Sequence, residues 1–387
     1  MSVPMRFLAR LLEAPDIIQF GARTAIRKHL TSIREYNNGT GLSSPPIQID
    51  IKLVDACNLR CKMCPQWGDS GYNLTRPTSS VKHAVPLDVY QHLMDEVAYF
   101  SPWIFLWGGE PMLYPDILPL ISYIKKKGMP ISLVTNGTLM KDRIPQIVEN
   151  KLDVLLFSID GPRDTHDCIR GYKGAFDQTI RAVQEVLQER KMRRQAKPFV
   201  AFVSVITSDN QHNFGEIFDL AEDLGIDLVL PVCSWYQTAE SGRKQTEILE
   251  ERMGITPWSW KGYLLDVQKI DPAVVRQGIR RVKARKWRFH YKFYPPIPEE
   301  KLDAFFHDHS DNLGFTTCTA PWVSAEILPN GDVANCRDYP DVVAGNIKST
   351  PFMELWNKGR LVEFRKLLID QGGRLPVCNR CHGLMGC

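Results

Sequence analysis

Three closely spaced cysteines, Cys57, Cys61 and Cys64, are the residues of this chain best suited to chemistry. They follow the apolar stretch 47–54 with the spacing C-x3-C-x2-C. Three thiolates can hold three irons of a [4Fe–4S] cube and leave the fourth iron open to a small molecule, whereas an electron-transfer cluster is closed by a fourth cysteine. Zinc sites prefer four ligands, usually in C-x2-C pairs, and a disulfide joins only two thiols. The spacing therefore favours a cluster with one open iron.

Four further cysteines, Cys318, Cys336, Cys378 and Cys381, form a second group late in the chain. The segment before Cys336 is predicted to be a hairpin that turns at the Pro-Asn-Gly sequence 329–331, and the last two cysteines form a C-x2-C pair. Four thiolates suit either a zinc ion or a closed iron–sulfur cube. The residues alone predict a second metal centre without identifying its metal.

The whole chain has the composition of an ordinary folded protein. Its 387 residues are enough for one large or two modest domains with a buried core. A net charge of +4 is too small to indicate nucleic-acid binding. No apolar run approaches the roughly 20 residues that span a bilayer, and no secretory signal is evident. Because eight of the ten cysteines fall in two groups, we expect metal sites in a reducing cytoplasm rather than disulfides.

Strands and helices are predicted to alternate from residue 47 onward. The predicted strands are Ile47–Val54, Trp103–Trp107, Pro130–Thr135, Asp153–Ile159, Phe199–Ile206 and Asp227–Val232. The predicted helices between them are Leu87–Phe100, Ile117–Lys127, Ile144–Asn150, Phe176–Lys191 and Phe214–Leu224. This order implies a parallel sheet with right-handed crossovers and helices outside, whose ligands bind at the carboxyl ends of the strands. Periodicity does not distinguish a barrel from a flat sheet.

Residues 1–46 stand apart as a basic amphipathic helical arm and linker. Two predicted helices, 5–12 and 17–30, carry apolar residues at helical spacing beside arginines and lysines. Three interpretations stay open: an arm packed on the body, a partner-docking arm, and an amphipathic helix that brings residues 1–35 to a membrane surface. In the connecting region 234–317, we expect a helix with a solvated basic face and then a strand leading to the next domain, rather than a nucleic-acid site.

Short motifs follow the predicted strands, and together with the cysteine triplet they resemble the radical S-adenosylmethionine (SAM) superfamily. The motifs are Gly108-Gly109-Glu110-Pro111, Thr135-Asn136-Gly137, Ser158-Ile159-Asp160-Gly161 and the segment His166 to Gly171. The resemblance covers roughly residues 47–231 and, separately, 318–381. It implies an α/β fold in which residues 47–233 form a partial (β/α)6 TIM-like barrel.

The second cysteine group resembles SPASM and twitch domains, which bind auxiliary [4Fe–4S] clusters. Full SPASM domains carry more cysteines and hold two such clusters, whereas this region has five. The resemblance therefore implies one auxiliary [4Fe–4S] cluster in a smaller SPASM/twitch-like α+β domain at residues 318–387. Its ligands would be Cys318, Cys336, Cys378 and Cys381. Cys387 keeps the spacing of the full pattern and is a substitute candidate for one of the four.

The resemblance also supplies a mechanism. SAM binds the open iron, the reduced cluster cleaves its carbon–sulfur bond, and the 5′-deoxyadenosyl radical abstracts hydrogen from a substrate; a flavodoxin- or ferredoxin-type protein is the implied reductant. Carried over by motif, Cys57, Cys61 and Cys64 hold this cluster. The implied SAM contacts are Met63 beside the adenine, Gly108, Gly109 and Glu110 at the amino group, Ser158 and Asp160 at the ribose, and Arg170 at the carboxylate. Strand-end packing, a turn cap and a surface ion pair are the respective alternatives for Ser158, Asp160 and Arg170.

Two cysteines lie outside both groups. Cys168 belongs to the His166–Gly171 motif, and Cys233 follows the sixth predicted strand. A free cysteine is most often a small core residue. Cys233 is also our candidate for a hydrogen-atom donor to a substrate radical, as in radical epimerases.

The leading hypothesis is an enzyme that oxidises, crosslinks or epimerises a ribosomal peptide. The alternative is dehydrogenation, coupling or rearrangement of a small molecule or lipid, and the basic arm favours a membrane-associated substrate. A non-enzymatic iron–sulfur redox sensor would leave the Gly-Gly-Glu-Pro motif and the open cluster unexplained. We expect no nucleic-acid partner, and a cytoplasmic location with or without membrane association.

Overall fold

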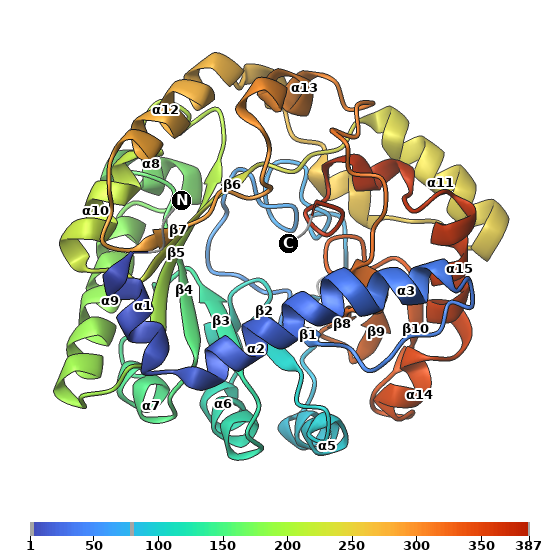
Figure 1. The fold of residues 1–387 in the computed structure, drawn as a ribbon, viewed down its shortest axis with the longest axis horizontal. Helices are drawn as coiled ribbons and strands as arrows, with labels where there is room; N and C mark the ends of the chain where they lie inside the picture. Colours follow the sequence, from blue (N-terminus) through green and yellow to red (C-terminus); the bar gives the residue numbers. More distant parts are fainter. Residues whose placement is uncertain (1–3, 78–80, 386–387) are drawn as a thin grey trace.

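The computed structural model describes residues 4–77 and 81–385, and they form one continuous ten-stranded sheet (Figure 1). Its strand order is β10-β9-β8-β1-β2-β3-β4-β5-β6-β7. The six strands expected from the sequence are β1 (Gln48–Lys52), β2 (Trp103–Trp107), β3 (Ile131–Thr135), β4 (Val154–Ser158), β5 (Phe199–Ile206) and β6 (Leu228–Cys233). They are adjacent in chain order and all parallel. The predicted α/β class and parallel sheet are confirmed.

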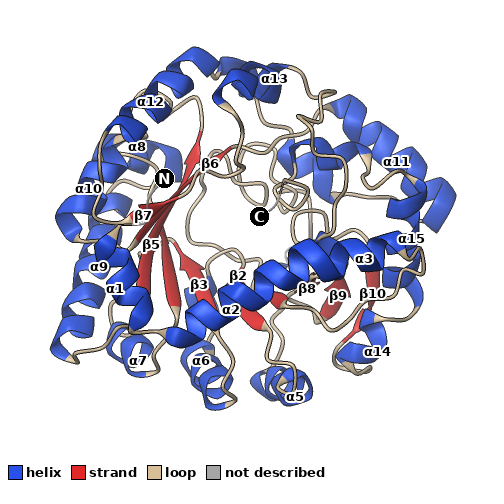
Figure 2. Ribbon diagram, in the orientation of Figure 1, coloured by secondary structure: helices blue, strands red, loops and turns tan. Residues whose placement is uncertain are grey.

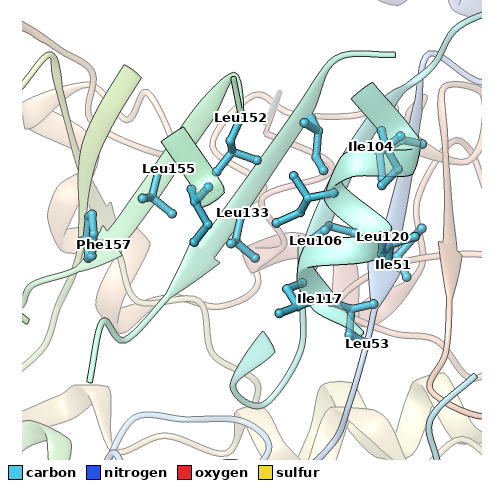
Figure 3. Packing of buried hydrophobic residues seen from close by; sticks show 14 of the residues in the cluster. Ile51, Leu53, Ile104, Leu106, Ile117, Leu120, Leu133, Leu152, Leu155 and Phe157 are labelled. Atoms are coloured by element: carbon cyan, nitrogen blue, oxygen red, sulfur yellow. The ribbon is translucent and has the colours of Figure 1, made fainter. Parts of the chain in front are cut away.

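Helices cover the outer face of this curved sheet (Figure 2). They are α5 (Leu87–Val97), α6 (Ile117–Lys126), α7 (Ile144–Glu149), α8 (Arg163–Arg170), α9 (Ala175–Met192) and α10 (Glu216–Leu224). Alternate strand residues such as Ile51, Leu106 and Leu133 point toward helix residues such as Ile117 and Leu120, and all five are fully buried (Figure 3). Burying each such side chain contributes about 1.5–3 kcal/mol. The other strand face is left to line the interior.

The C-terminal region extends the same sheet. Strand β8 (Ser324–Ile327) pairs parallel with β1, and β9 (Asp332–Ala334) folds back antiparallel to β8. The predicted hairpin is confirmed, and Gly331 takes the left-handed conformation (φ 93°) that its turn requires. Strand β10 (Val343–Asn346) and helices α14 (Phe352–Trp356) and α15 (Gly359–Asp370) complete the region.

The connecting region contains α11 (Ala239–Met253), α12 (Pro272–Ala284), the short strand β7 (His290–Tyr291) and α13 (Leu302–His307). The expected basic helix is α12, whose Arg280 and Lys283 form ion pairs with Glu299. The expected strand is β7, which pairs parallel with β6 at the edge of the sheet.

The N-terminal arm closes the amino end of the sheet. It consists of α1 (Met5–Leu12), α2 (Pro15–Ile26), a π-helical turn (Arg27–Thr31) and α3 (Ser32–Asn37), and Figure 1 shows it running across the strands. Its side chains meet residues that begin strands or come just before them.

Three pairs show this contact. Phe7 stacks on His290 at the start of β7, and Phe20 packs on Trp103 at the start of β2. Arg27 donates to the Trp322 carbonyl, two residues before β8, at 3.0 Å. The arm is thus packed on the body. No helix in the described residues is long and apolar enough to cross a membrane.

Candidate active site and second cysteine centre

The first three cysteines lie in the loop that follows the carboxyl end of β1. The Lys62 backbone N–H donates to the Ile169 carbonyl at 3.0 Å, which fixes this loop against α8. Burial raises the pKa of the Cys57 thiol to about 12, and the nearby Cys61 and Cys64 groups add to the shift. The three thiols are thus close enough to influence one another in a water-poor loop, and iron must displace their protons to bind.

The glycine pair of the second motif lets β2 pass directly beneath this loop. The Gly109 N–H donates to the Val54 carbonyl at 2.7 Å, and the Glu110 N–H donates to the Ala56 carbonyl at 2.8 Å. A Cβ on Gly108 would lie 2.5 Å from the Val54 oxygen, and one on Gly109 would overlap the Ala56 carbonyl. Only glycine permits this approach, so the pair positions the segment that carries the cysteines.

Glu110 joins the second and third motifs. Its carboxylate accepts hydrogen bonds from the Thr135 hydroxyl at 2.7 Å and from the backbone N–H groups of Asn136 at 2.9 Å and Met112 at 3.0 Å. Burial raises the pKa of Glu110, while the two N–H groups oppose that shift. The side chain therefore has a fixed orientation at the carboxyl ends of β2 and β3.

A buried ion pair lies beside the cysteine loop. An Asp160 carboxylate oxygen is 2.6 Å from Arg170 Nη2, and Arg170 Nη1 lies 3.6 Å from Cys61 Sγ. The other Asp160 oxygen accepts the Val205 N–H at 3.0 Å. Burial alone would lower the pKa of Arg170, but Asp160 and Cys61 raise it above its usual value. Asp160 is thus the counterion that holds Arg170 against a cysteine, and Arg170 is not a surface residue.

A cleft of about 450 Å³ opens beside the cysteine loop. Met63 and Ile169 line it together with Thr207 and Ser234, which follow the carboxyl ends of β5 and β6. Met63, the residue before Cys64, thus faces the cleft. Ser158 is half-buried at the end of β4, and it is not among the residues that line this cleft.

The charged residues of the cleft are largely paired with one another. Lys62 forms an ion pair with Asp209 at 3.2 Å, and Lys269 pairs with Asp266 at 2.9 Å. Asp69 is a third acidic lining residue. The cleft therefore has a slightly negative lining, which favours a neutral or cationic ligand.

The second group of four cysteines is also brought together. Cys318 is anchored by its N–H, which donates to the Gly373 carbonyl at 2.8 Å, and Cys336 follows strand β9. Burial raises the pKa of the Cys381 thiol well above its usual value, and Cys378, Cys318 and Cys336 add to the shift. Residues far apart in the sequence thus form one buried thiol group. Cys387 lies outside the described residues.

The number of thiols in each group matches a different kind of cluster. Three thiolates suit a [4Fe–4S] cluster with one open iron, and four thiolates suit a closed cluster. Cys57, Cys61 and Cys64 are the three-thiol group, and the four-thiol group is Cys318, Cys336, Cys378 and Cys381.

An aromatic cluster packs against the second thiol group. Tyr263 and Tyr339 have ring centroids 5.1 Å apart, and Cys336 and Cys381 pack against the cluster that contains them. Burial raises the pKa of Tyr263, and the nearby Asp338 and Tyr72 add to the shift. Burial also raises the pKa of Tyr72, and Cys64 is among the groups that add to that shift. Buried tyrosines thus lie near both thiol groups.

The charged residue Lys52 on β1 was not predicted from the sequence to have a role. Lys52 is buried, forms an ion pair with Asp55 and donates to the Tyr72 hydroxyl at 3.1 Å. Burial would lower the pKa of Lys52, but Tyr72 and Asp55 raise it to about 12. The sequence signal is the alternation of Gln48, Asp50 and Lys52 with isoleucines, which puts three polar residues on one face of the strand.

The two remaining cysteines differ in their surroundings. Cys168 is exposed, and its sulfur accepts a hydrogen bond from Lys62 Nζ at 3.2 Å. Cys233 is buried in an apolar cluster with Phe214 and Ile279, and burial raises its pKa to about 12. The neighbouring Ser234, not Cys233, lines the cleft. The role of Cys233 as a hydrogen-atom donor stays a prediction.

Two known protein families match separate parts of the chain. The sequence model of the radical SAM superfamily matches residues 51–221. The model of the SPASM family, described as an iron–sulfur cluster-binding domain, matches residues 318–382. The two matches contain the three-thiol group and the four-thiol group, respectively.

Three similar proteins illustrate the range of relatives. An AdoMet-dependent heme synthase of Methanosarcina barkeri is 28% identical over 89% of this chain and 92% of its own length. The subtilosin biosynthesis protein AlbA of Bacillus subtilis is 23% identical over 90% of this chain and 67% of its own. The crystal structure of Streptococcus suis SuiB bound to S-adenosylmethionine has a TM-score of 0.61 at 15% identity, over 89% of this chain and 72% of that one. This last likeness is one of fold.

Proposed function

The chain is a radical SAM enzyme with a C-terminal SPASM domain, and we propose that it oxidises its substrate by removing a hydrogen atom and then an electron. A [4Fe–4S] cluster with an open iron supplies reductive cleavage of SAM to a radical that abstracts hydrogen. Cys318, Cys336, Cys378 and Cys381 would hold an auxiliary cluster, which would accept one electron from the substrate radical. With the loss of a proton, the substrate would then have lost two hydrogens in total. A flavodoxin- or ferredoxin-type protein is the proposed reductant.

One observation carries this proposal: both thiol groups are built on neighbouring strands of a single sheet. Strand β1 leads into the Cys57–Cys64 loop, and β8, its direct parallel neighbour, leads through β9 to Cys336. Cys336 and Cys381 pack against a cluster that contains the buried Tyr263 and Tyr339. An auxiliary cluster in this place is suited to accept an electron from a substrate held between the two centres.

The residues around the first cluster have distinct proposed roles. Cys57, Cys61 and Cys64 hold it, and Arg170 places a positive charge beside Cys61, where it attracts the SAM carboxylate. Gly108 and Gly109 bring backbone groups close to the loop, and Glu110 faces the SAM amino group. Met63 contacts the adenine from the cleft, and Ser158 is the proposed ribose contact.

We propose a peptide as the substrate. The similarity to AlbA, to the sporulation killing factor maturation protein SkfB, and in fold to SuiB supports this choice. The cleft also supports it, because its lysines are paired and its lining is slightly negative. A tetrapyrrole is the second candidate, favoured by the nearly full-length similarity to a heme synthase, but its carboxylates would find no unpaired lysine in this cleft.

Metal content and SAM cleavage together test the proposal. Anaerobically reconstituted protein should hold about eight irons, and the triple variant Cys57→Ala/Cys61→Ala/Cys64→Ala about four. With dithionite and SAM, the wild type should release 5′-deoxyadenosine and Cys61→Ala should not. Zinc at the second centre, or cleavage by Cys61→Ala, would contradict the assignment.

The double variant Cys378→Ala/Cys381→Ala tests the oxidative step. It should still form 5′-deoxyadenosine but no product that is lighter by two hydrogens in mass spectrometry of treated peptides. If this variant makes the lighter product at the wild-type rate, the auxiliary cluster is not the electron acceptor. If the wild type instead leaves the mass of the peptide unchanged, the reaction is redox-neutral. Epimerisation with hydrogen-atom donation by Cys233 would then be tested with Cys233→Ala.

A further inference from the structure

Large apolar side chains are exposed in an uneven distribution. Fourteen are exposed among the described residues, and seven of them stand on the N-terminal arm. These seven are Met5, Leu8, Leu12, Ile18, Ile26, Leu30 and Ile33, which we call the arm ridge. Met5, Leu12 and Leu30 are 80%, 75% and 67% exposed. Exposed apolar side chains gathered on one element indicate an interaction site, whereas scattered ones need no explanation.

The ridge lies on the face of the arm that points away from the rest of the protein. Phe7, Phe20 and Arg27, on the opposite side of the helices, contact the amino ends of the strands. On α2 and its continuation, Ile18, Ile26, Leu30 and Ile33 recur at spacings of three, four and eight residues, which places them on one helical face. The arm is thus fixed to the protein by one face and presents an aliphatic face outward.

Basic loops lie at the same end of the sheet as the ridge, and α1 contacts two of them through Arg6 and Arg10. The loops that enter β3, β4, β5, β6 and β7 lie at the same amino end of the sheet, because each precedes a parallel strand. Their basic residues are Lys127, Lys151, Arg193, Arg194, Lys197, Arg285, Lys286 and Arg288. Their only acidic residues, Asp153 and Asp227, are both buried.

Several of these cations are available to a ligand. Lys151, Arg194 and Lys286 are exposed, and no described residue forms an ion pair with them. Lys191, at the end of α9, is exposed in the same way. Acidic residues on adjacent helices neutralise part of the remaining charge, since Lys127 pairs with Asp95 and Arg288 with Glu222.

Two more exposed apolar residues belong to this end. Tyr99 lies in the loop before β2, and Met192 ends α9 beside Arg193 and Arg194. With them, nine of the fourteen exposed large apolar side chains lie at the amino end of the sheet. Aliphatic and aromatic groups ringed by lysine and arginine are the surface composition of a protein that rests on an anionic lipid interface.

We propose that the arm ridge and the basic loops around it form a docking face for an anionic membrane surface. The aliphatic side chains enter the interface between headgroups and acyl chains, while Lys151, Lys191, Arg194 and Lys286 contact lipid phosphates. A protein partner would have to bring both an apolar groove and a surrounding acidic rim, whereas an anionic bilayer offers both at once. The cleft beside Met63 lies at the opposite, carboxyl end of the strands, so docking leaves it accessible.

Vesicle flotation of the full, cluster-loaded chain tests this proposal. We expect the wild type to float with phosphatidylcholine vesicles that contain about one third phosphatidylglycerol and to bind poorly to pure phosphatidylcholine. The triple variant Leu12→Ser/Ile26→Ser/Leu30→Ser should bind at least about tenfold less. Removing Lys151, Lys191 and Arg194 together should weaken binding by about fivefold for each cation, and about 1 M salt should have a similar effect on the wild type.

A matched control uses exposed apolar residues elsewhere. Leu74→Ser/Tyr172→Ser alters two such residues outside the arm and the basic loops, and it should bind vesicles like the wild type. Iron content and 5′-deoxyadenosine formation should be normal in the ridge variant, which shows that it is folded. The proposal is overturned if the wild type does not float with anionic vesicles, or if the ridge variant floats equally well. A wild-type dimer that the ridge substitutions dissociate, without vesicle binding, would identify a second copy of the chain as the occupant.

Discussion

Replacing Asp160 by asparagine isolates the buried Arg170 cation beside the first cluster. Asn keeps the shape of the side chain and an oxygen for the Val205 N–H, but it removes the carboxylate charge 2.6 Å from Arg170 Nη2. Removing one partner of a buried ion pair costs about 3–5 kcal/mol of unfolding free energy. For 387 residues with an unfolding entropy of about 2.1 cal/mol/K per residue, this corresponds to a fall in Tm of about 4–6 °C.

A double-mutant cycle with Arg170→Gln separates two roles of Asp160. If Asp160 acts by holding Arg170, Asp160→Asn should weaken SAM binding in the wild type and have little further effect once Arg170 is absent. The stability losses should also be non-additive, with a coupling of at least about 1 kcal/mol. Circular dichroism gives the Tm of the four proteins, and anaerobic calorimetry gives their SAM affinity.

The opposite pattern would refute this reasoning. If Asp160→Asn weakens SAM binding by the same factor in both backgrounds and the stability losses add, Asp160 contacts SAM itself. The ribose contact implied by the sequence motif would then be correct, and the ion pair would be incidental to binding. Val205→Ala, which keeps the backbone N–H, serves as a control for local repacking.

Two further outcomes follow from local geometry. Gly109→Ala should lower the iron content of the first cluster while leaving the second loaded, because a Cβ there overlaps the Ala56 carbonyl. Normal iron content would show that the loop adapts. Gly21→Ala is the control, because a Cβ at this helical glycine meets open space. Burial, together with Arg170, lowers the pKa of His166 to about 3. Between about pH 6.5 and pH 3, His166 is therefore protonated in the unfolded chain but neutral in the folded chain. The free energy of unfolding should therefore decrease as the pH is lowered from about 6.5 to about 3. His166→Asn should reduce the slope of this decrease by up to about 1.4 kcal/mol per pH unit. Denaturation of the two proteins at several pH values measures both slopes.

The strands and the cysteine sets were predictable because their signals are local. Apolar runs such as Phe199–Ile206 coincide with strands of the structure, since a parallel strand covered by helices needs an apolar run. The motifs follow strands β2, β3 and β4 because ligands of parallel sheets bind at the carboxyl ends. For Cys57, Cys61 and Cys64, the spacing alone was enough to predict a cluster site.

The partners of individual side chains were not predictable, because they depend on contacts between distant segments. Asp160 and Arg170 are ten residues apart in the sequence, yet only the fold shows that Arg170 is buried against Cys61. The pairing of β8, in the C-terminal domain, with β1 of the barrel also joins segments that are far apart in the sequence. Lys52 was overlooked because a charge in an apolar strand acquires meaning only when Asp55 and Tyr72 are seen around it.

The arm shows how burial can reverse an inference from composition. Its arginines suggested a basic face toward a membrane, but Arg10 forms an ion pair with the buried Asp227 and Arg27 is buried against Trp322. The aliphatic residues, which composition would assign to the core, face outward instead. Docking through them points the cleft away from the lipid, because the ridge and the cleft lie at opposite ends of the strands. Membrane contact therefore concerns where the enzyme resides and gives no support to a lipid substrate; a substrate that enters the polar cleft beside Met63 arrives from the aqueous side.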